Sequence, residues 1–379
     1  RSPKPSISRV LLTMFLIDRR LILRFDWALF FVALAIVLIG IVNIYSAGYS
    51  LGPGVAMYKR QIYWLCLGII FLFVGAFLDY AYIEQYCYAL YLLTLVLLFY
   101  VLFQGKLVGG SQRWIPLGFF NLQPSELAKI SLAMVLAKWF QRKYDPKGYT
   151  IRALLPPLAL TAIPFSLIFL QPDLGTGLML LAIFCSIVVF VKFRLTSFIF
   201  TLCCFISLVP FVWHLLKPYQ KHRILGFLDP GLDPLGKGYQ LIQSKIAIGS
   251  GQLWGQGYLK GTQSQLDFIP EKYTDFVFSV FCEEWGFLGA AILLGLYFLL
   301  FLRIATIVSH ARDSFGMILG FSIASLFLWQ FTINLGMVLG LLPIVGIPLP
   351  LFSYGGSSLL ISMFSLGVLI NIHIKRHIF

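Results

Sequence analysis

The stretch QLDFIPEKYTDFVFSVFCEEWG (265–286) gathers acidic side chains in a chain that is only 12% charged. Asp275 stands directly before the apolar run FVFSVF, so its carboxylate is expected at the mouth of a membrane-spanning segment. An ionisable group at that depth is costly and marks a functional site by default. Such a carboxylate can accept the proton of a hydroxyl group or orient that group. The alternative is a helix N-cap, because Asp is a good cap and an anion suits a helix N-terminus.

The charged residues on either side of Asp275 extend this candidate site. Glu271 and Lys272 form a polar approach immediately upstream, which favours function over simple capping. At about 100° per residue along a helix, Glu283 points about 80° from Asp275 and is predicted to line the same cavity. Glu284 points about 180° away and is expected to face another helix. For both of these glutamates, a buried structural hydrogen bond is the alternative.

The segment GGSQRWIPLGFFNLQPSELAKI (109–130) predicts a helix start that carries an ion pair. Gln123 and Ser125 flank a proline, and proline is favoured in the first turn of a helix. Glu126 and Lys129 follow three residues apart, so they share one helix face and are able to pair inside the membrane boundary.

Arg113 and Trp114 lie upstream of that helix start and are expected at the same outer level. The fixed fork of donors on Arg113 suits a phosphate group. The alternative is an arginine whose charged head reaches the interface beside a tryptophan of the aromatic belt.

The segment LPIVGIPLPLFSYGGSSLL (342–360) contains three prolines, and Ser353 and Tyr354 follow them. Non-helical backbone at membrane depth survives only where protein or a cavity covers it, so these residues are candidates for binding. Small residues also permit close helix packing, which is the alternative. Similarly, QPDLGTG (171–177) predicts a tight turn in which Asp173 caps the next helix.

The six cysteines give no sign of a metal centre. They lie in or beside apolar runs, with no CxxC and no histidine-paired spacing. The sequence therefore predicts neither a metal-ligand cluster nor a disulfide framework.

The composition sets the class of protein that must position these residues. Of the 379 residues, 59% are hydrophobic and 16% aromatic, and the mean hydropathy is +0.87. Soluble domains carry about a quarter charged residues, twice the share found here. The apolar residues come in blocks long enough to cross a bilayer, which predicts an all-α polytopic membrane protein. The net charge of +14 is explained by basic residues flanking those blocks, so nucleic acid is not expected as a partner.

About ten transmembrane helices are predicted, and one long loop, about 216–275, precedes the eighth. Within that loop, QLIQSKIAIG is expected to form a short amphipathic helix. The span at 125–141 has the weakest signal because it is short and contains two lysines. The apolar blocks run at about 27–47, 60–78, 86–104, 125–141, 152–170, 174–192, 196–215, 276–302, 314–341 and 356–373.

The loops on one side hold most of the lysine and arginine, which predicts that this side is cytoplasmic. We therefore expect a cytoplasmic N-terminal segment at 1–26, one membrane domain at 27–375 and a cytoplasmic tail at 376–379. The long loop would then be extracytoplasmic. VLLTMFLI (10–17) is expected to be a cytoplasmic or interfacial segment, because it is short and lacks a small-residue cleavage site.

Four motifs, RWIPLG with QPSELAK, QPDLGTG, FIPEKYTDFVF with EEWG, and PLFSYGGSS, resemble the SEDS family (shape, elongation, division and sporulation) in the same order. Members of that family are membrane glycosyltransferases that polymerise peptidoglycan. The resemblance covers about residues 25–375, and IPLP before SYGGSS is closer to the elongation type than to the division type. Tyr273 stands where many members have histidine.

The resemblance implies a substrate and a partner. The substrate is lipid II, a disaccharide-pentapeptide on undecaprenyl pyrophosphate, and the partner is a class B penicillin-binding protein transpeptidase. The family's essential acid falls on Asp275, and Glu126 and Lys129 fall in its central cavity.

The expected chemistry is a single displacement with inversion, in which Asp275 is the base for the acceptor hydroxyl. The expected cations for the departing pyrophosphate are Lys59, Arg60, Arg113 and Lys129, and a divalent cation (Mg²⁺ or Mn²⁺) is a possible cofactor. A lipid flippase or transporter, an inert scaffold for the transpeptidase, and a division or sporulation paralogue are the alternatives. The full set of expected substrate-binding residues is Arg60, Arg113, Trp114, Gln123, Ser125, Glu126, Lys129, Glu271, Lys272, Ser353 and Tyr354, with membrane lipids around them.

Overall fold

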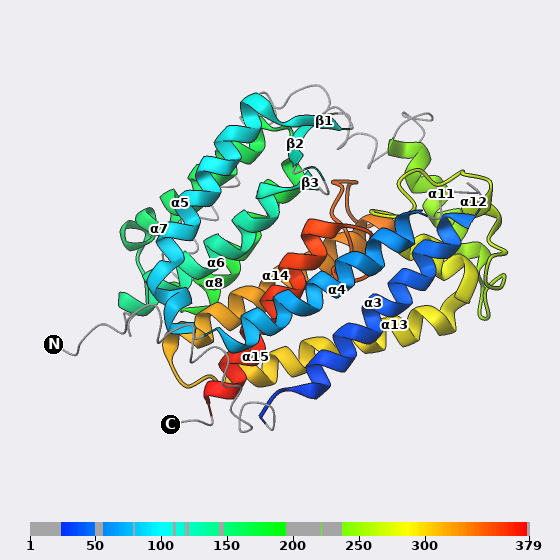
Figure 1. Ribbon diagram of the computed structural model, residues 1–379. Helices are drawn as coiled ribbons and strands as arrows, with labels where there is room; N and C mark the ends of the chain where they lie inside the picture. Colours follow the sequence, from blue (N-terminus) through cyan, green and yellow to red (C-terminus); the bar gives the residue numbers. More distant parts are fainter. Residues whose placement is uncertain are drawn as a thin grey trace.

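A bundle of long apolar helices forms the protein (Figure 1). The computed structural model describes residues 24–49, 56–78, 80–108, 111–116, 118, 121–143, 148–194, 221 and 237–376. Within these residues, seven helices are long and apolar enough to cross a membrane. They are α3 (Trp27–Ala47), α4 (Ala56–Phe77), α5 (Tyr80–Gln104), α7 (Ile151–Leu170), α13 (Val277–Ser309), α14 (Ser314–Val338) and α15 (Gly356–Lys375).

Two further helices coincide with predicted spans. α8 (Leu174–Phe190) is apolar but has 17 residues, and α6 (Pro124–Arg142) is the predicted span with two lysines. The predicted span at 196–215 and the first part of the long loop, 216–236, lie outside the described residues. The helical membrane class is therefore confirmed, and the count of ten spans stays a prediction.

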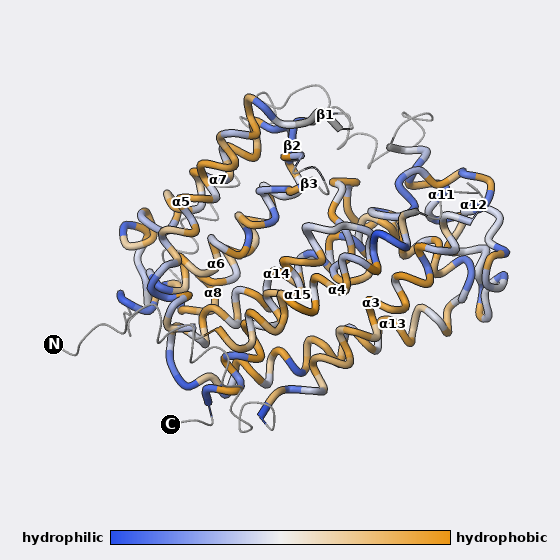
Figure 2. The backbone as a smooth tube through the Cα atoms, in the orientation of Figure 1, coloured by the Kyte–Doolittle hydropathy of each residue, from blue (hydrophilic) through white to orange (hydrophobic). Residues whose placement is uncertain are grey.

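The weak hydropathy of α6 is explained by its position inside the bundle. Almost every residue from Pro124 to Phe140 is buried, and the helix packs against α5, α7, α8, α14 and α15. Because α6 faces protein rather than lipid, it can carry charged residues that a lipid-facing helix could not. Figure 2 shows the apolar colouring along the outer helices, with hydrophilic residues gathered at their ends.

A three-stranded antiparallel sheet joins the end of α5 to the start of α6, in the order β1-β2-β3. Its strands are β1 (Lys106–Val108), β2 (Ser111–Pro116) and β3 (Asn121–Leu122). Lys106 pairs with Trp114, and Ile115 pairs with Leu122. The all-α prediction did not include this sheet, which pairs backbone groups that a loop would leave to solvent.

α13 is broken at Gly286, where φ is 61° and ψ is −163°. A loop that follows α11 (Lys237–Ser250) and precedes α12 (Thr262–Gln265) fills the break. Backbone groups freed by the break bond to this loop, as buried or membrane-exposed backbone requires. The four bonds, 2.8–3.2 Å long, are Gln256 N–Glu283 O, Gly257 N–Glu284 O, Phe287 N–Gln252 O and Leu288 N–Leu253 O. α11 confirms the amphipathic helix predicted in the long loop.

Candidate active site

Asp275 lies in the turn that leads into α13 and is partly buried. The N-cap of α13 is Phe276 and not Asp275. The alternative prediction, that Asp275 is the N-cap of this helix, is therefore wrong. The side chain of Asn334, on α14, donates to the backbone carbonyl of Asp275 (2.9 Å) and to that of Ile347 (2.8 Å). Gly346 has a φ of 76°, and a Cβ there would lie 3.2 Å from Oδ2 of Asp275. The carboxylate is thus turned towards the loop between α14 and α15.

The residues just before α15 are bonded to the turn that holds Asp275. The hydroxyl of Ser353 donates to the carbonyl of Thr274 (2.6 Å) and accepts from the amide of Leu349 (2.8 Å). The amide of Tyr354 donates to the carbonyl of Tyr273 (2.9 Å). The SYGGSS motif is therefore fastened to the TDF motif by bonds that use backbone carbonyls, which explains why a non-helical segment is stable here.

Gln61, on α4, also binds the segment just before α15. Its buried side-chain amide donates to the carbonyl of Ser353 (3.2 Å) and accepts from the amide of Gly355 (3.3 Å). Sequence reasoning missed Gln61 and Asn334. Each carries a side-chain amide inside an apolar helix, and that is the signal that could have found them.

The start of α6 is joined to the start of α15. The amide of Gln123 donates to the hydroxyl of Ser357 (3.2 Å), which in turn donates to the carbonyl of Asn121 (3.2 Å). The side chain of Gln123 donates to the hydroxyl of Ser125 (3.1 Å). The segment from Leu349 to Ser357, which includes the first turn of α15, thus has the TDF motif bonded to one part and the QPSE motif bonded to another.

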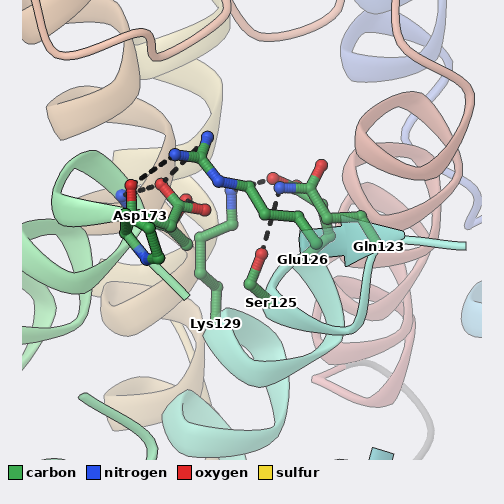
Figure 3. A network of polar contacts seen from close by, with 8 residues as sticks. Gln123, Ser125, Glu126, Lys129 and Asp173 are labelled. Carbon is green, nitrogen blue, oxygen red and sulfur yellow. Dashed lines mark hydrogen bonds and ion pairs between the residues drawn. The ribbon is translucent and has the colours of Figure 1, made fainter. Parts of the chain in front are cut away.

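Glu126 and Lys129 form the predicted ion pair, with 2.8 Å between Nζ and Oε1. Both residues are buried, at 5% and 2% exposure. A buried charge is tolerated when a close, hydrogen-bonded partner compensates it, as in this pair. Figure 3 shows both side chains close to Asp173.

Arg113 reaches from β2 to the QPD turn. Its Nη2 donates to the carbonyl of Pro172 (2.5 Å), and its Nη1 lies 3.6 Å from a carboxylate oxygen of Asp173. The Nε of Arg113 is buried and has no hydrogen-bond partner in the part of the chain that the structure describes. Asp173 also accepts from the amide of Thr176 (3.3 Å), which is the helix cap predicted for it. Two cations and two carboxylates therefore meet beside the start of α6 (Figure 3).

The other predicted substrate-binding residues are Lys272, Glu271, Arg60 and Trp114. Lys272 is buried, and its Nζ donates to the carbonyl of Ser264 (2.7 Å) and pairs with Asp267. Glu271 is exposed and accepts a bond from the side chain of Thr274 (3.2 Å). Arg60 is exposed on α4, and Trp114 lies partly buried in β2.

Glu283 is fully buried, and its carboxylate is directed at α12. It accepts from the backbone amides of Gln263 (2.7 Å) and Ser264 (3.2 Å), so it holds the N-terminus of that short helix. This is the structural hydrogen bond weighed as the alternative, and these bonds do not lead to Asp275. Glu284 accepts from the hydroxyl of Ser46 on α3, so it faces another helix as predicted.

These features define the class of protein: a multi-pass membrane protein with buried polar groups gathered near the starts of α6, α13 and α15. The family model named FTSW_RODA_SPOVE, described as "Cell cycle protein", matches residues 26–378. The chain belongs to this family, which confirms the resemblance found in the sequence.

Similar proteins match this chain over almost its whole length. Peptidoglycan glycosyltransferase MrdB of Escherichia coli K12 is 39% identical over 355 residues, covering 93% of this chain and 94% of that protein. Peptidoglycan glycosyltransferase RodA of Treponema pallidum is 33% identical over 426 residues, covering 93% and 98%.

Two solved structures share the fold. The structure described as "structural coordination of polymerization and crosslinking by a peptidoglycan synthase complex" has a chain 38% identical to this one, with a TM-score of 0.80 and coverage of 94% and 99%. The crystal structure of the rod shape determining protein RodA of Thermus thermophilus is 31% identical, with a TM-score of 0.69 and coverage of 93% and 98%.

Proposed function

We propose that this protein is a peptidoglycan glycosyltransferase of the elongation type, which polymerises lipid II into glycan strands with Asp275 as base. One observation carries the proposal. Motifs that are far apart in the sequence are bonded to one continuous segment: Ser353, in the loop before α15, bonds to the turn of Asp275, and Ser357, in the first turn of α15, bonds to the start of α6. The relatives named peptidoglycan glycosyltransferase give the class of enzyme.

The proposed step is one displacement at the anomeric carbon of the donor. The acceptor hydroxyl gives its proton to Asp275 as its oxygen forms the new bond to that carbon. The bond from the same carbon to the phosphate oxygen breaks, and undecaprenyl pyrophosphate leaves with the electron pair. With a single displacement, the α-linked donor becomes a β-linked glycan.

Cations at the start of α6 are proposed to stabilise the leaving pyrophosphate. Lys129 is held in place by Glu126, and Arg113 is held in place by Asp173 and Pro172. Positive groups that are already positioned favour a transition state in which negative charge develops. The buried Nε of Arg113 adds a donor that has no hydrogen-bond partner among the described residues.

A divalent cation, if it shares this work, would arrive with the pyrophosphate. Among the described residues, no group of three or more His, Cys, Asp or Glu side chains is placed to hold a metal ion.

The proposed orientation places both termini in the cytoplasm and Asp275 at the extracytoplasmic surface. It rests on the bias of lysine and arginine towards one set of loops. The lipid tails of donor and acceptor then stay in the bilayer while their sugars meet at its surface, which gives a sugar-polymerising enzyme a reason to be built from membrane helices.

The proposed partner is a class B penicillin-binding protein. Its support is the similar chain in a structure described as a peptidoglycan synthase complex that coordinates polymerization and crosslinking. A transpeptidase at the same membrane would crosslink the strands as they are made.

The proposal is tested by reconstituting the full chain and its partner in vesicles with fluorescent lipid II. Glycan strands should form with the wild type and with Asp267→Asn, a matched change at an exposed carboxylate of the same segment. Strands should not form with Asp275→Asn. Movement of lipid II between leaflets without strand synthesis in the wild type would instead establish a flippase.

A further inference from the structure

The segment before α15 enters the bundle as non-helical backbone. Its residues Leu349, Pro350 and Leu351 are buried and lie outside any helix or strand. A Cβ at Gly40, in α3, would lie 2.5 Å from the carbonyl oxygen of Phe352, so this backbone lies directly against a membrane helix. Backbone in such a position must bond to protein, because lipid offers no hydrogen-bond partner.

A tight turn in this segment has an unusual corner. The amide of Phe352 donates to the carbonyl of Leu349 (3.3 Å), with Pro350 and Leu351 between them. Leu351 has a φ of 67°, a conformation that ordinarily favours glycine at this place in a turn. Pro350 has no amide hydrogen, so its carbonyl is the one backbone group through which it can bond. A strained turn of this kind persists only where the surrounding structure holds it.

Tyr297 holds the turn at the carbonyl of Pro350. This tyrosine, on α13, is fully buried, and its hydroxyl donates to that carbonyl oxygen (2.5 Å). Its ring packs on the ring of Phe331, in α14, with 4.7 Å between ring centroids, which restricts the direction of the hydroxyl. At about 1.5 Å per residue, Tyr297 lies about 16 Å beyond the break at Gly286. The bond is therefore made inside the membrane-spanning part of α13.

The other end of the turn is bonded to the residues around Asp275. The amide of Ser353 donates to the carbonyl of Leu349 (3.0 Å), and its hydroxyl accepts from the amide of Leu349 (2.8 Å). The same hydroxyl donates to the carbonyl of Thr274 (2.6 Å), the residue before Asp275. A shift of the turn would therefore move Ser353 and, through it, the backbone that carries the Asp275 carboxylate.

We infer that Tyr297 is a positioning residue for strand synthesis, which acts on Asp275 through Pro350 and Ser353. The inference rests on the proposed function of Asp275. The Tyr297 hydroxyl holds the turn in its strained conformation, and the turn presents Ser353 to Thr274. This bond sets the direction of the Asp275 carboxylate, and a base must lie within hydrogen-bond reach of the proton that it accepts.

The test is Tyr297→Phe, which removes one hydroxyl and keeps the packed ring. The variant is purified with the partner and supplied with lipid II in vesicles. Its kcat for strand synthesis should fall about tenfold, a rough figure for a displaced reacting group, with KM changed by less than about twofold.

Tyr91→Phe is the matched control. Tyr91, on α5, is also buried, and its hydroxyl also donates to a backbone carbonyl, that of Leu160 on α7 (2.6 Å). Each variant leaves one buried carbonyl without this donor, so both should lower the thermal midpoint. Only Tyr297→Phe should lower kcat. Equal losses of kcat in the two variants, or an unchanged kcat in Tyr297→Phe, would overturn the inference.

A double-mutant cycle tests the path from Tyr297 to Asp275. If Tyr297 acts through Ser353, Tyr297→Phe should lower kcat much less in a Ser353→Ala background than in the wild type. Additive losses of activity from these two substitutions would also overturn the inference. Wild type and Asp275→Asn are measured alongside: an inactive wild type or an active Asp275→Asn would overturn the proposed function itself.

Discussion

Glu126 and Lys129 illustrate how much one charged residue depends on another inside this bundle. The two are 2.8 Å apart and almost fully buried, so each compensates the charge of the other. Removing one partner of such a pair leaves an uncompensated buried charge, which costs about 3–5 kcal/mol, whereas replacing both is far less costly. The pair is therefore a structural requirement as well as a proposed part of the site.

We expect Glu126→Gln and Lys129→Met each to lower thermal stability and polymerase activity, because each leaves the other residue alone. The double variant should recover part of the lost stability, since no buried charge remains. Activity should stay low in the double variant if Lys129 binds pyrophosphate. Thermal midpoints and strand synthesis of the four proteins form a double-mutant cycle, and purely additive losses of stability would show that the two residues act separately.

Asn334 positions Asp275 through the backbone. Its side chain donates to the carbonyls of Asp275 and Ile347, and so ties the turn that holds Asp275 to the loop that contains Gly346. We expect Asn334→Ala to lower kcat for strand synthesis at least tenfold, a rough figure for a displaced catalytic group, with KM changed little. Asn43→Ala is the control, because Asn43 bonds the carbonyl of Val277, two residues further along. An equal loss of kcat in both variants would mean that Asn334 has only a structural role.

At the scale of elements, the break in α13 and the loop docked into it form one unit. A Cβ at Gly251 would lie 2.0 Å from the carbonyl oxygen of Cys282, so the loop backbone must approach the helix this closely. The loop leads into α12, whose N-terminus Glu283 holds. The EEWG motif is thus explained by packing: Gly286 breaks the helix and Glu283 fixes the segment that covers the break.

This explanation makes a prediction for neighbouring glycines. Gly251→Ala should lower the thermal midpoint strongly and weaken the fold around α12, because the added methyl group overlaps backbone that cannot move independently. Gly249→Ala should leave the midpoint unchanged or raise it, because no heavy atom of the described residues lies within 4 Å of an added Cβ and alanine favours the helix. Thermal unfolding of both variants tests this prediction. Similar midpoints would contradict the docking of the loop into the break in α13.

The sequence predicted the helical elements well and some side-chain partners poorly. The apolar blocks predicted the membrane helices, and the three-residue spacing of Glu126 and Lys129 predicted their ion pair. The pairing of Lys272 with Asp267 was beyond reach because it depends on a folded loop in which Asp267 has a φ of 59°. The sheet was missed because strands of two to six residues carry little periodic signal. The direction of the Glu283 side chain could not be predicted, because it depends on a loop that docks only in the folded chain.

At the scale of the whole molecule, the proposed orientation predicts which ends of the helices face outward. In a variant without its own cysteines, Glu271→Cys should react with a membrane-impermeant maleimide in intact cells with a permeable outer envelope. Arg312→Cys, between α13 and α14, should react only after the membrane is opened. The reverse pattern of labelling would place Asp275 in the cytoplasm and contradict the proposed orientation.

The proposed reaction depends on Asp275 as the group that accepts the hydroxyl proton. The most direct measurement compares lipid II binding and the rate of strand synthesis in the wild type and in Asp275→Asn, both purified with the partner and both shown to be folded. We predict that binding changes little while the rate falls at least 100-fold, the lower range for a lost general base. A rate within tenfold of the wild type, or a loss of binding that explains the whole loss of rate, would contradict the account.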